Sequence, residues 1–177
     1  IAQRDMIPIS ANFVPIENVA AQWRDYALAR EKAGQIADRQ VWRVCRNILV
    51  TETDEAGAQL LTDPDGVIAH YFRYIRGVRQ IEEFQSLQQE PLPLLNEFLE
   101  VPLALEDCAI VGSADTVLAR LIELVDELGP FGTLVMVGHD WDESGLSQGS
   151  MHRMAEDILP QLKQHVDSLG SERWIES

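Results

Sequence analysis

The stretch from Val111 to Pro160 constrains the fold of this chain more than any other part of its sequence. Apolar residues recur at steps of three and four along its first part: Leu118, Leu121, Ile122, Val125 and Leu128. This spacing predicts an amphipathic helix. The helix is expected to open at Ser113 or Asp115, and Gly129 with the following proline marks a turn at its end.

The run from Thr133 to Val137 is short and continuously apolar. Such a run predicts a parallel strand that is covered on both faces. A polar loop is expected from His139 to Gly149, followed by a second helix that reaches Pro160. Leu162 and Val166 are expected to extend this helix for a turn or two past a kink at the proline. This helix-strand-helix unit places the chain in the α/β class.

The part of the chain before this unit repeats the alternation of strands and helices. Val41–Thr51 is a predicted strand because of its β-branched content and its place between two helical patterns. Met6–Ser10 is either a short strand or a frayed terminus. Pro15 suits the first turn of one helix. Thr53 or Asp54 suits the N-cap of the next, because a short side-chain oxygen can accept from the free amides there.

Three further segments carry weaker signals. Val67–Val78 has aromatic residues at near-helical spacing, whereas residues 84–100 contain Pro91 and Pro93, which excludes one continuous helix. That segment is interpreted as an irregular insertion or two short helices, with no catalytic residue assigned. Residues 168–177 are predicted to form a tail.

Composition narrows the classes of function that the chain can serve. The 177 residues suit one domain, and the net charge of −15 makes binding to nucleic acid or to an anionic membrane surface unfavourable. Cys45 and Cys108 lie in apolar runs, so we expect two buried free thiols and no metal site. The sequence has no long apolar stretch and nothing near Ile1 that resembles a signal peptide, so a cytoplasmic location is predicted.

Several common catalytic motifs are missing from the sequence. It contains no GxGxxG, P-loop, paired CxxC, HExxH or GxSxG motif. Readings as a nucleotide-loop protein, a zinc enzyme or an α/β-hydrolase therefore lack the residues that they require.

Two long segments resemble luciferase-like flavin-dependent monooxygenases, the group that includes bacterial luciferase and limonene monooxygenase-like proteins. The first runs through FGTLVMVGHDW and a polar insert to SMHRMAEDILPQL. Here Gly112-Ser113-Ala114-Asp115 stands where the family has Gly-Thr-Pro-Glu, and Ile158-Leu159-Pro160 stands where it has Val-Met-Pro. The second is DRQVWRVCRNILVTETDEAGAQL with Trp23 in the preceding helix, which is similar to the family's D-R-x-x-W-R strand and T-D-x-A helix start.

The resemblance implies the C-terminal part of a (β/α)8 TIM barrel, with about three parallel strands alternating with helices. It aligns the first strand here with about the sixth of eight, in a fold of about 250 residues. Residues 1–177 are thus expected to form a single domain or a fragment whose N-terminal strands, with much of the active site, precede Ile1.

The resemblance also implies an activity: oxygenation of a small organic substrate with O₂ and reduced FMN, which a flavin reductase could supply. A coenzyme F420-dependent oxidoreductase of the same fold is the near alternative. A non-catalytic flavin-binding or structural fragment is the alternative from another class. The catalytic residues, the substrate and any homo-oligomer stay open at this point.

Four residues are candidates for the site. His139, Asp140 and Trp141 directly follow the predicted strand, and the C-terminal ends of barrel strands form the reaction face. Trp141 could form part of a flavin-binding wall, and His139 and Asp140 are candidates for the substrate pocket. Ser10, at the end of the first strand, is a second candidate for cofactor binding. Alternatively, His139 and Asp140 begin a solvated loop and Trp141 packs against the last helix.

Overall fold

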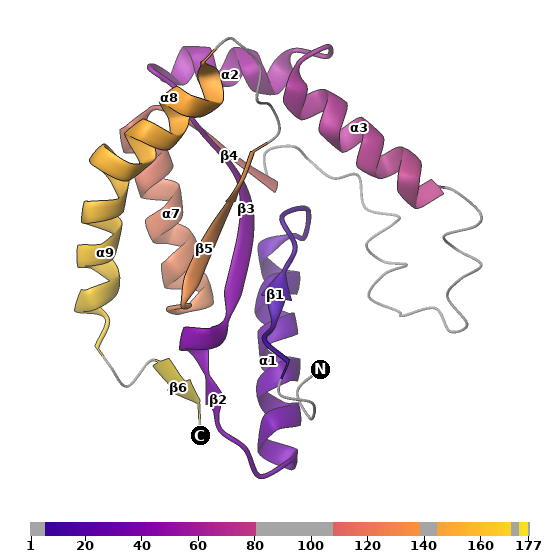
Figure 1. The fold of residues 1–177 in the computed structure, drawn as a ribbon, viewed down its shortest axis with the longest axis vertical. Helices are drawn as coiled ribbons and strands as arrows, with labels where there is room; N and C mark the ends of the chain where they lie inside the picture. Colours follow the sequence, from indigo (N-terminus) through magenta and orange to yellow (C-terminus); the bar gives the residue numbers. More distant parts are fainter. Residues whose placement is uncertain (1–5, 81–107, 139–144, 171–173, 177) are drawn as a thin grey trace.

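The computed structural model describes residues 6–80, 108–138, 145–170 and 174–176. In chain order its elements are β1 (Ile9–Ser10), α1 (Ile16–Lys32), β2 (Ala37–Asp38), the 3-10 turn η2 (Arg39–Val41), β3 (Arg43–Val50), α2 (Asp54–Thr62), α3 (Val67–Gln80), β4 (Ala109–Gly112), α7 (Ala114–Leu128), β5 (Thr133–Val137), α8 (Leu146–Arg153), the π-helical turn η3 (Met154–Ile158), α9 (Leu159–Ser168) and β6 (Ile175–Glu176) (Figure 1).

Strand β3 is the centre of a parallel sheet. Both β1 and β5 pair with Arg43 and Val44, so these two strands lie on opposite edges of β3. Strand β4 pairs with the other end of β3, from Asn47 to Val50, and extends the edge that β1 occupies. The order β1-β3-β5, with helices in the connections, is that of consecutive strands in a (β/α) barrel. The predicted α/β class is therefore confirmed.

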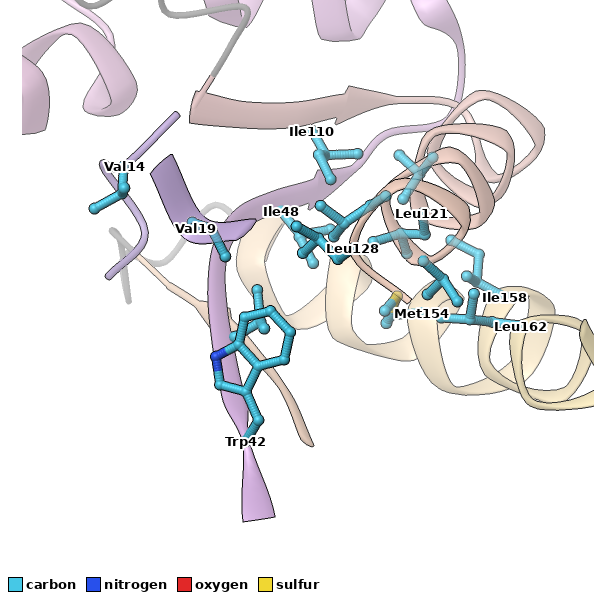
Figure 2. Close-up of a cluster of buried hydrophobic side chains, with 14 of the residues drawn as sticks. Val14, Val19, Trp42, Ile48, Ile110, Leu121, Leu128, Met154, Ile158 and Leu162 are labelled. Carbon is cyan, nitrogen blue, oxygen red and sulfur yellow. The ribbon is translucent and has the colours of Figure 1, made fainter. Parts of the chain in front are cut away.

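The two faces of this sheet pack against different elements. The outer face carries Val44 and Ile48, which join side chains of α1, α7, η3 and α9 in one buried apolar cluster (Figure 2). Because side chains alternate along a strand, Cys45, Asn47 and Leu49 point to the inner face. Leu49 there packs against a smaller cluster that includes residues of α3 and β4.

Helix α7 begins and ends as predicted. Ser113 is its N-cap, and the Ser113 hydroxyl accepts a hydrogen bond from the Thr116 backbone N–H at 3.4 Å. Gly129 follows the last turn with φ 76°, a conformation that glycine adopts without the steric penalty of a Cβ. Local capping chemistry therefore fixes both ends of this helix.

Strand β5 has the predicted bounds, but the expected coverage of both its faces is wrong. Thr133 is exposed and the next four residues are only half-buried. Among the described residues β5 pairs with β3 alone. Leu134 and Met136 pack against the outer-face cluster, and they remain only partly buried.

The other predicted elements of the first half are present. Strand β1 is shorter than the predicted Met6–Ser10, and α1 begins directly after Pro15. The Thr53 hydroxyl accepts from the Ala56 N–H at 3.2 Å and so caps α2, as predicted. The predicted free and buried state of the two cysteines is also confirmed. The interpretation of residues 84–100 falls outside the described residues.

The C-terminal region confirms one expectation and corrects another. The helical run continues past Pro160 to Ser168, which is the predicted extension through Leu162 and Val166, and the π-helical turn η3 lies directly before α9. The predicted tail instead contains β6, which pairs antiparallel with β2 through Ile175 and Asp38. In the part of the chain that the structure describes, no helix has the length and apolar character needed to span a membrane.

Candidate functional site

A cavity of about 190 Å³ lies where the C-terminal ends of the strands meet the starts of α3 and α8. In a (β/α) barrel this end of the sheet is the reaction face. The lining residues are Asn47, Ile48, Leu49, Val67, Ile68, Val111, Met136, Val137, Gly138, Leu146, Ser147 and Met151. The wall therefore combines three strands with two helices from distant parts of the sequence.

The wall of this cavity is almost entirely apolar. Its described lining includes no charged side chain, and Asn47 and Ser147 are its only polar side chains. Asn47 is buried, and its amide donates to the carbonyl oxygens of Asn12 at 3.0 Å and Cys108 at 2.7 Å. Those bonds hold the Asn47 amide against the protein backbone.

A small polar cluster of Asn12, Asn47 and Tyr71 lies on the inner face beside the cavity. The Asn12 side-chain amide donates to Asn47 Oδ1 and, at 2.9 Å, to the Tyr71 hydroxyl. The Tyr71 hydroxyl in turn lies within donating distance of Asn12 Oδ1, at 3.3 Å. The cluster ties α3 to the end of β1. Sequence reasoning missed it, and the only available signal was the position of Asn12 just beyond the first strand.

Ser10 lies on the opposite side of the sheet from this cluster. It pairs in register with Val44, which is an outer-face residue, and its side chain is buried. The Ser10 hydroxyl accepts a hydrogen bond from Trp42 Nε1 at 3.1 Å. The structure thus does not bring Ser10 to the cavity, and its predicted role in cofactor binding stays a prediction.

The other three predicted site residues, His139, Asp140 and Trp141, lie outside the described residues. The chain leads directly to them from the cavity, because Val137 and Gly138 are part of its lining. Their assignment to the site therefore also stays a prediction.

A second, more open hollow of about 770 Å³ lies between α2 and α8. Leu146 lines both this hollow and the cavity, so the two adjoin. Arg153 lines the hollow but forms an ion pair with Glu52 at 3.0 Å, and its guanidinium also donates to the Val50 carbonyl at 3.4 Å. The Arg153 guanidinium is therefore already engaged by partners within the chain.

The N-terminus of α7 is another place where an anion could bind, but a carboxylate of the chain occupies it. Asp54 Oδ1 accepts from the Ser113 N–H at 2.7 Å, and Oδ2 accepts from the Thr116 hydroxyl at 2.9 Å. These hydrogen bonds, first of all the one from the Ser113 backbone, lower the pKa of Asp54. A phosphate at this helix end would have to displace a charged group of the same sign.

The site defined by this geometry is an apolar cavity at the strand ends of a partial, parallel (β/α) barrel. No family model matches the chain. Two curated proteins do: 3,6-diketocamphane 1,6-monooxygenase of Pseudomonas putida, 25% identical over 90% of this chain, and 4-hydroxyprotoasukamycin monooxygenase of Streptomyces nodosus subsp. asukaensis, 23% identical over 90%. The chain spans 42% and 41% of their respective lengths.

Solved structures give the same result for the fold. The oxygenating constituent of 3,6-diketocamphane monooxygenase from Pseudomonas putida, a type II Baeyer-Villiger monooxygenase in complex with FMN, superposes with a TM-score of 0.66 at 24% identity, covering 90% of this chain and 44% of that one. A monooxygenase from Streptomyces bottropensis gives a TM-score of 0.54 at 18% identity, with coverages of 90% and 43%. A riboflavin lyase with modified FMN gives 0.53 at 14%, with 94% and 40%. The resemblance to luciferase-like flavin-dependent monooxygenases and the partial barrel fold are confirmed.

The described residues match a flavin only in part. The apolar wall suits one face of a planar ring. However, 190 Å³ is below the roughly 300 Å³ at which pockets for drug-sized ligands begin, so this cavity does not enclose a whole flavin. A flavin phosphate also needs amides, hydroxyls or a cation, and the described lining of the cavity has no cation. The phosphate cradle is thus not among the described residues of this site.

Proposed function

We propose that this chain is part of a flavin-dependent monooxygenase that uses reduced FMN and O₂ to oxygenate a small organic substrate. The observation that carries the proposal is the sequence similarity, over 90% of the chain, to two monooxygenases, together with the fold that it shares with part of a solved 3,6-diketocamphane monooxygenase. The apolar cavity at the reaction face supports it, because such chemistry requires a site from which water is excluded.

The chain's own residues would supply walls and position to the reaction. Bound reduced flavin supplies the electrons that activate O₂. The cavity wall formed by Leu49, Val111 and Val137 would exclude water from the substrate. The proposal assigns the phosphate contacts to residues other than the described lining of the cavity.

The names of the relatives suggest a reaction class to test first. The 3,6-diketocamphane monooxygenase of Pseudomonas putida is described as a type II Baeyer-Villiger monooxygenase. We therefore propose a small cyclic ketone as the first substrate class to examine, with a separate flavin reductase as the source of reduced FMN. We also propose a cytoplasmic location, where a reductase and reduced nicotinamide are available.

The test uses the intact product of the native gene together with a flavin reductase, FMN, NADH and a panel of cyclic ketones. We expect an oxygenated product that depends on both FMN and O₂, measured by gas chromatography with mass spectrometry. A parallel assay replaces FMN with reduced coenzyme F420 under otherwise identical conditions. Turnover with F420 and none with FMN would contradict the proposed cofactor, and no product with either would contradict the proposed activity.

Trp141 offers a test of the predicted reaction face. If its indole shields the site, Trp141→Ala in the intact protein should raise peroxide release per product formed, with only a small loss of thermal stability. The matched control is Trp174→Ala near the C-terminus. A loss of stability of about 3 to 5 kcal/mol with unchanged coupling would mean instead that Trp141 is a packing residue.

A further inference from the structure

Four residues of the cavity wall come from the inner face of the sheet. Leu49 pairs in register with Val111, and Asn47 pairs with Val137, so all four side chains point to the same face. This face is the interior side of a (β/α) barrel, and the cavity lies at the reaction end of the strands. A molecule in the cavity is therefore held next to the place where barrel enzymes bind their reactants.

The volume of the cavity suits a very small molecule. An apolar cavity of about 150 Å³ is known to stay dry and to bind xenon. The cavity here is about 190 Å³, which is below the roughly 300 Å³ at which pockets for drug-sized ligands begin. A flavin ring system is too large for this space, whereas a dissolved gas molecule fits it.

The cavity wall offers little to a polar ligand. Asn47 and Ser147 are the only polar side chains of its described lining, and the buried Asn47 amide already donates to two backbone carbonyl oxygens. A ketone carbonyl that left water for this wall would lose hydrogen bonds with little to replace them. Dioxygen is apolar, so it enters such a space without that cost and gains by leaving water.

We propose that this cavity is a binding site for dioxygen, and that it holds neither the flavin ring nor the organic substrate. This inference rests on the proposed function, because oxidation of reduced FMN by O₂ is the reaction that such a site would supply. It adds the place from which O₂ reaches the flavin and the side chains that hold it there: Leu49, Val111 and Val137.

The unpaired electrons of O₂ speed the magnetic relaxation of nearby nuclei, so binding can be measured by NMR without turnover. The intact flavin-free protein, labelled with ¹³C-methyl leucine and valine, is compared under nitrogen and under oxygen. Val111 and Leu162 are both 7% exposed, but Leu162 lies in the outer-face cluster. We expect O₂ to enhance methyl relaxation at least twofold more for Val111 than for Leu162. Val137 should exceed Leu134 likewise, since both are half-buried residues of β5. Equal enhancement within both pairs would overturn the inference.

Competing ligands distinguish a dioxygen site from a substrate or flavin pocket. The relaxation measurement is repeated with saturating cyclohexanone and, separately, with saturating FMN. The O₂ enhancement at Val111 and Val137 should persist in both cases. If either ligand abolishes it, the cavity belongs to that ligand and the inference fails. A failed oxygenation assay with the enhancement intact would contradict only the proposed function.

A variant that fills the cavity tests the same site by a second route. Val67→Trp adds an indole to the wall at the start of α3, whereas His70→Trp adds one at an exposed position of the same helix outside the lining. Val67→Trp alone should remove at least half of the O₂ enhancement at Val111. It should also slow reoxidation of bound reduced FMN by O₂ at least threefold in stopped-flow measurements. Unchanged Val44 and Leu121 methyl signals would show that both variants fold, and equal behaviour of the two folded variants would overturn the inference.

Discussion

Alternate side chains of the central strand β3 face two very different environments. On the outer face Val44, and Trp42 directly before the strand, are 0% and 1% exposed and lie in the large apolar cluster. On the inner face Ile9, Arg43 and Thr133 are aligned in register across three strands and are all exposed, Ile9 to 62%. Further along the same face lie the Asn12–Asn47–Tyr71 cluster and the cavity.

The difference shows that successive residues of one strand have different roles, because they point to opposite faces of the sheet. The outer face holds the chain together by apolar burial, which gains about 25 cal/mol per Å². The inner face holds polar contacts and a ligand-sized space. Substitutions on the outer face should thus change stability, and those on the inner face should change local order or binding.

The most direct way to break this comparison is to truncate one large residue on each face. Trp42→Ala should lower the free energy of unfolding by about 3 to 5 kcal/mol, because Trp42 stacks on Trp23 with ring centroids 4.8 Å apart. Ile9→Ala should change it by about 0.5 kcal/mol or less. Urea denaturation followed by circular dichroism measures both, and equal losses would show that the inner face also carries the core.

A smaller loss of stability is expected when a side-chain acceptor is removed from the edge of β3, at a position that β5 does not reach. There the hydroxyl of the fully buried Ser150 accepts from the Val50 N–H at 2.8 Å. Ser150→Ala leaves that amide without this acceptor and should cost about 1 to 3 kcal/mol. The exposed Ser168→Ala on α9 is the control. Faster hydrogen exchange at Val50 would identify the cause, and protection equal to that of the parent chain would contradict it.

The inner-face polar cluster should contribute less again. Tyr71→Phe removes the hydroxyl that bonds to Asn12 but keeps the ring against Phe72, so we expect a loss of about 0.5 to 1.5 kcal/mol. Tyr74→Phe on the same helix is the matched control, because Tyr74 is 62% exposed. Equal stabilities of the two variants would show that the contact between α3 and β1 contributes nothing measurable.

The smallest expected change in stability comes from Asp54, which links α2 to the start of α7, and it depends on pH. Hydrogen bonds from Ser113 and Thr116 lower the pKa of Asp54 in the folded chain below its unfolded value of about 3.9. The stabilisation is therefore present above about pH 4 and is lost as pH falls through the folded pKa. Stability measured from pH 7 to pH 3 should decline more steeply for the parent chain than for Asp54→Asn, with Glu55→Gln as the control for charge. Parallel declines would contradict the link.

Elements of the fold that depend on interactions between residues close in sequence could be predicted, and those that depend on distant residues could not. Ser113 and Gly129 fix the ends of α7 within a few residues, so its bounds could be predicted from the sequence. The half-buried state of β5 could not be predicted, because an apolar run indicates that its side chains favour burial but does not show which elements pack against them. The pairing of β6 with β2 was missed for the same reason, since it joins distant residues such as Asp38 and Ile175.

The candidate site was less predictable than the fold. The sequence pointed correctly to the end of β5, and Gly138 does line the cavity. Yet Tyr71 reaches Asn12 across 59 positions, and no spacing rule connects two such residues. Ser10 illustrates the opposite error of inference, because its place at a strand end did not reveal that the Trp42 indole uses its hydroxyl.

The π-helical turn between α8 and α9 reconciles the four-residue spacing of the buried residues with the 3.6-residue turn of an α-helix. Buried residues on this helical run recur at every fourth position: Ser150, Met154, Ile158 and Leu162. In an α-helix of 3.6 residues per turn, each such step would rotate the buried stripe by about 40°, so Leu162 would drift off the core. The wider turn η3 (Met154–Ile158) takes up more residues per turn and returns the stripe to the core. One continuous seam thus runs from Ser150 beside the cavity to the far end of the core, and η3 keeps it straight.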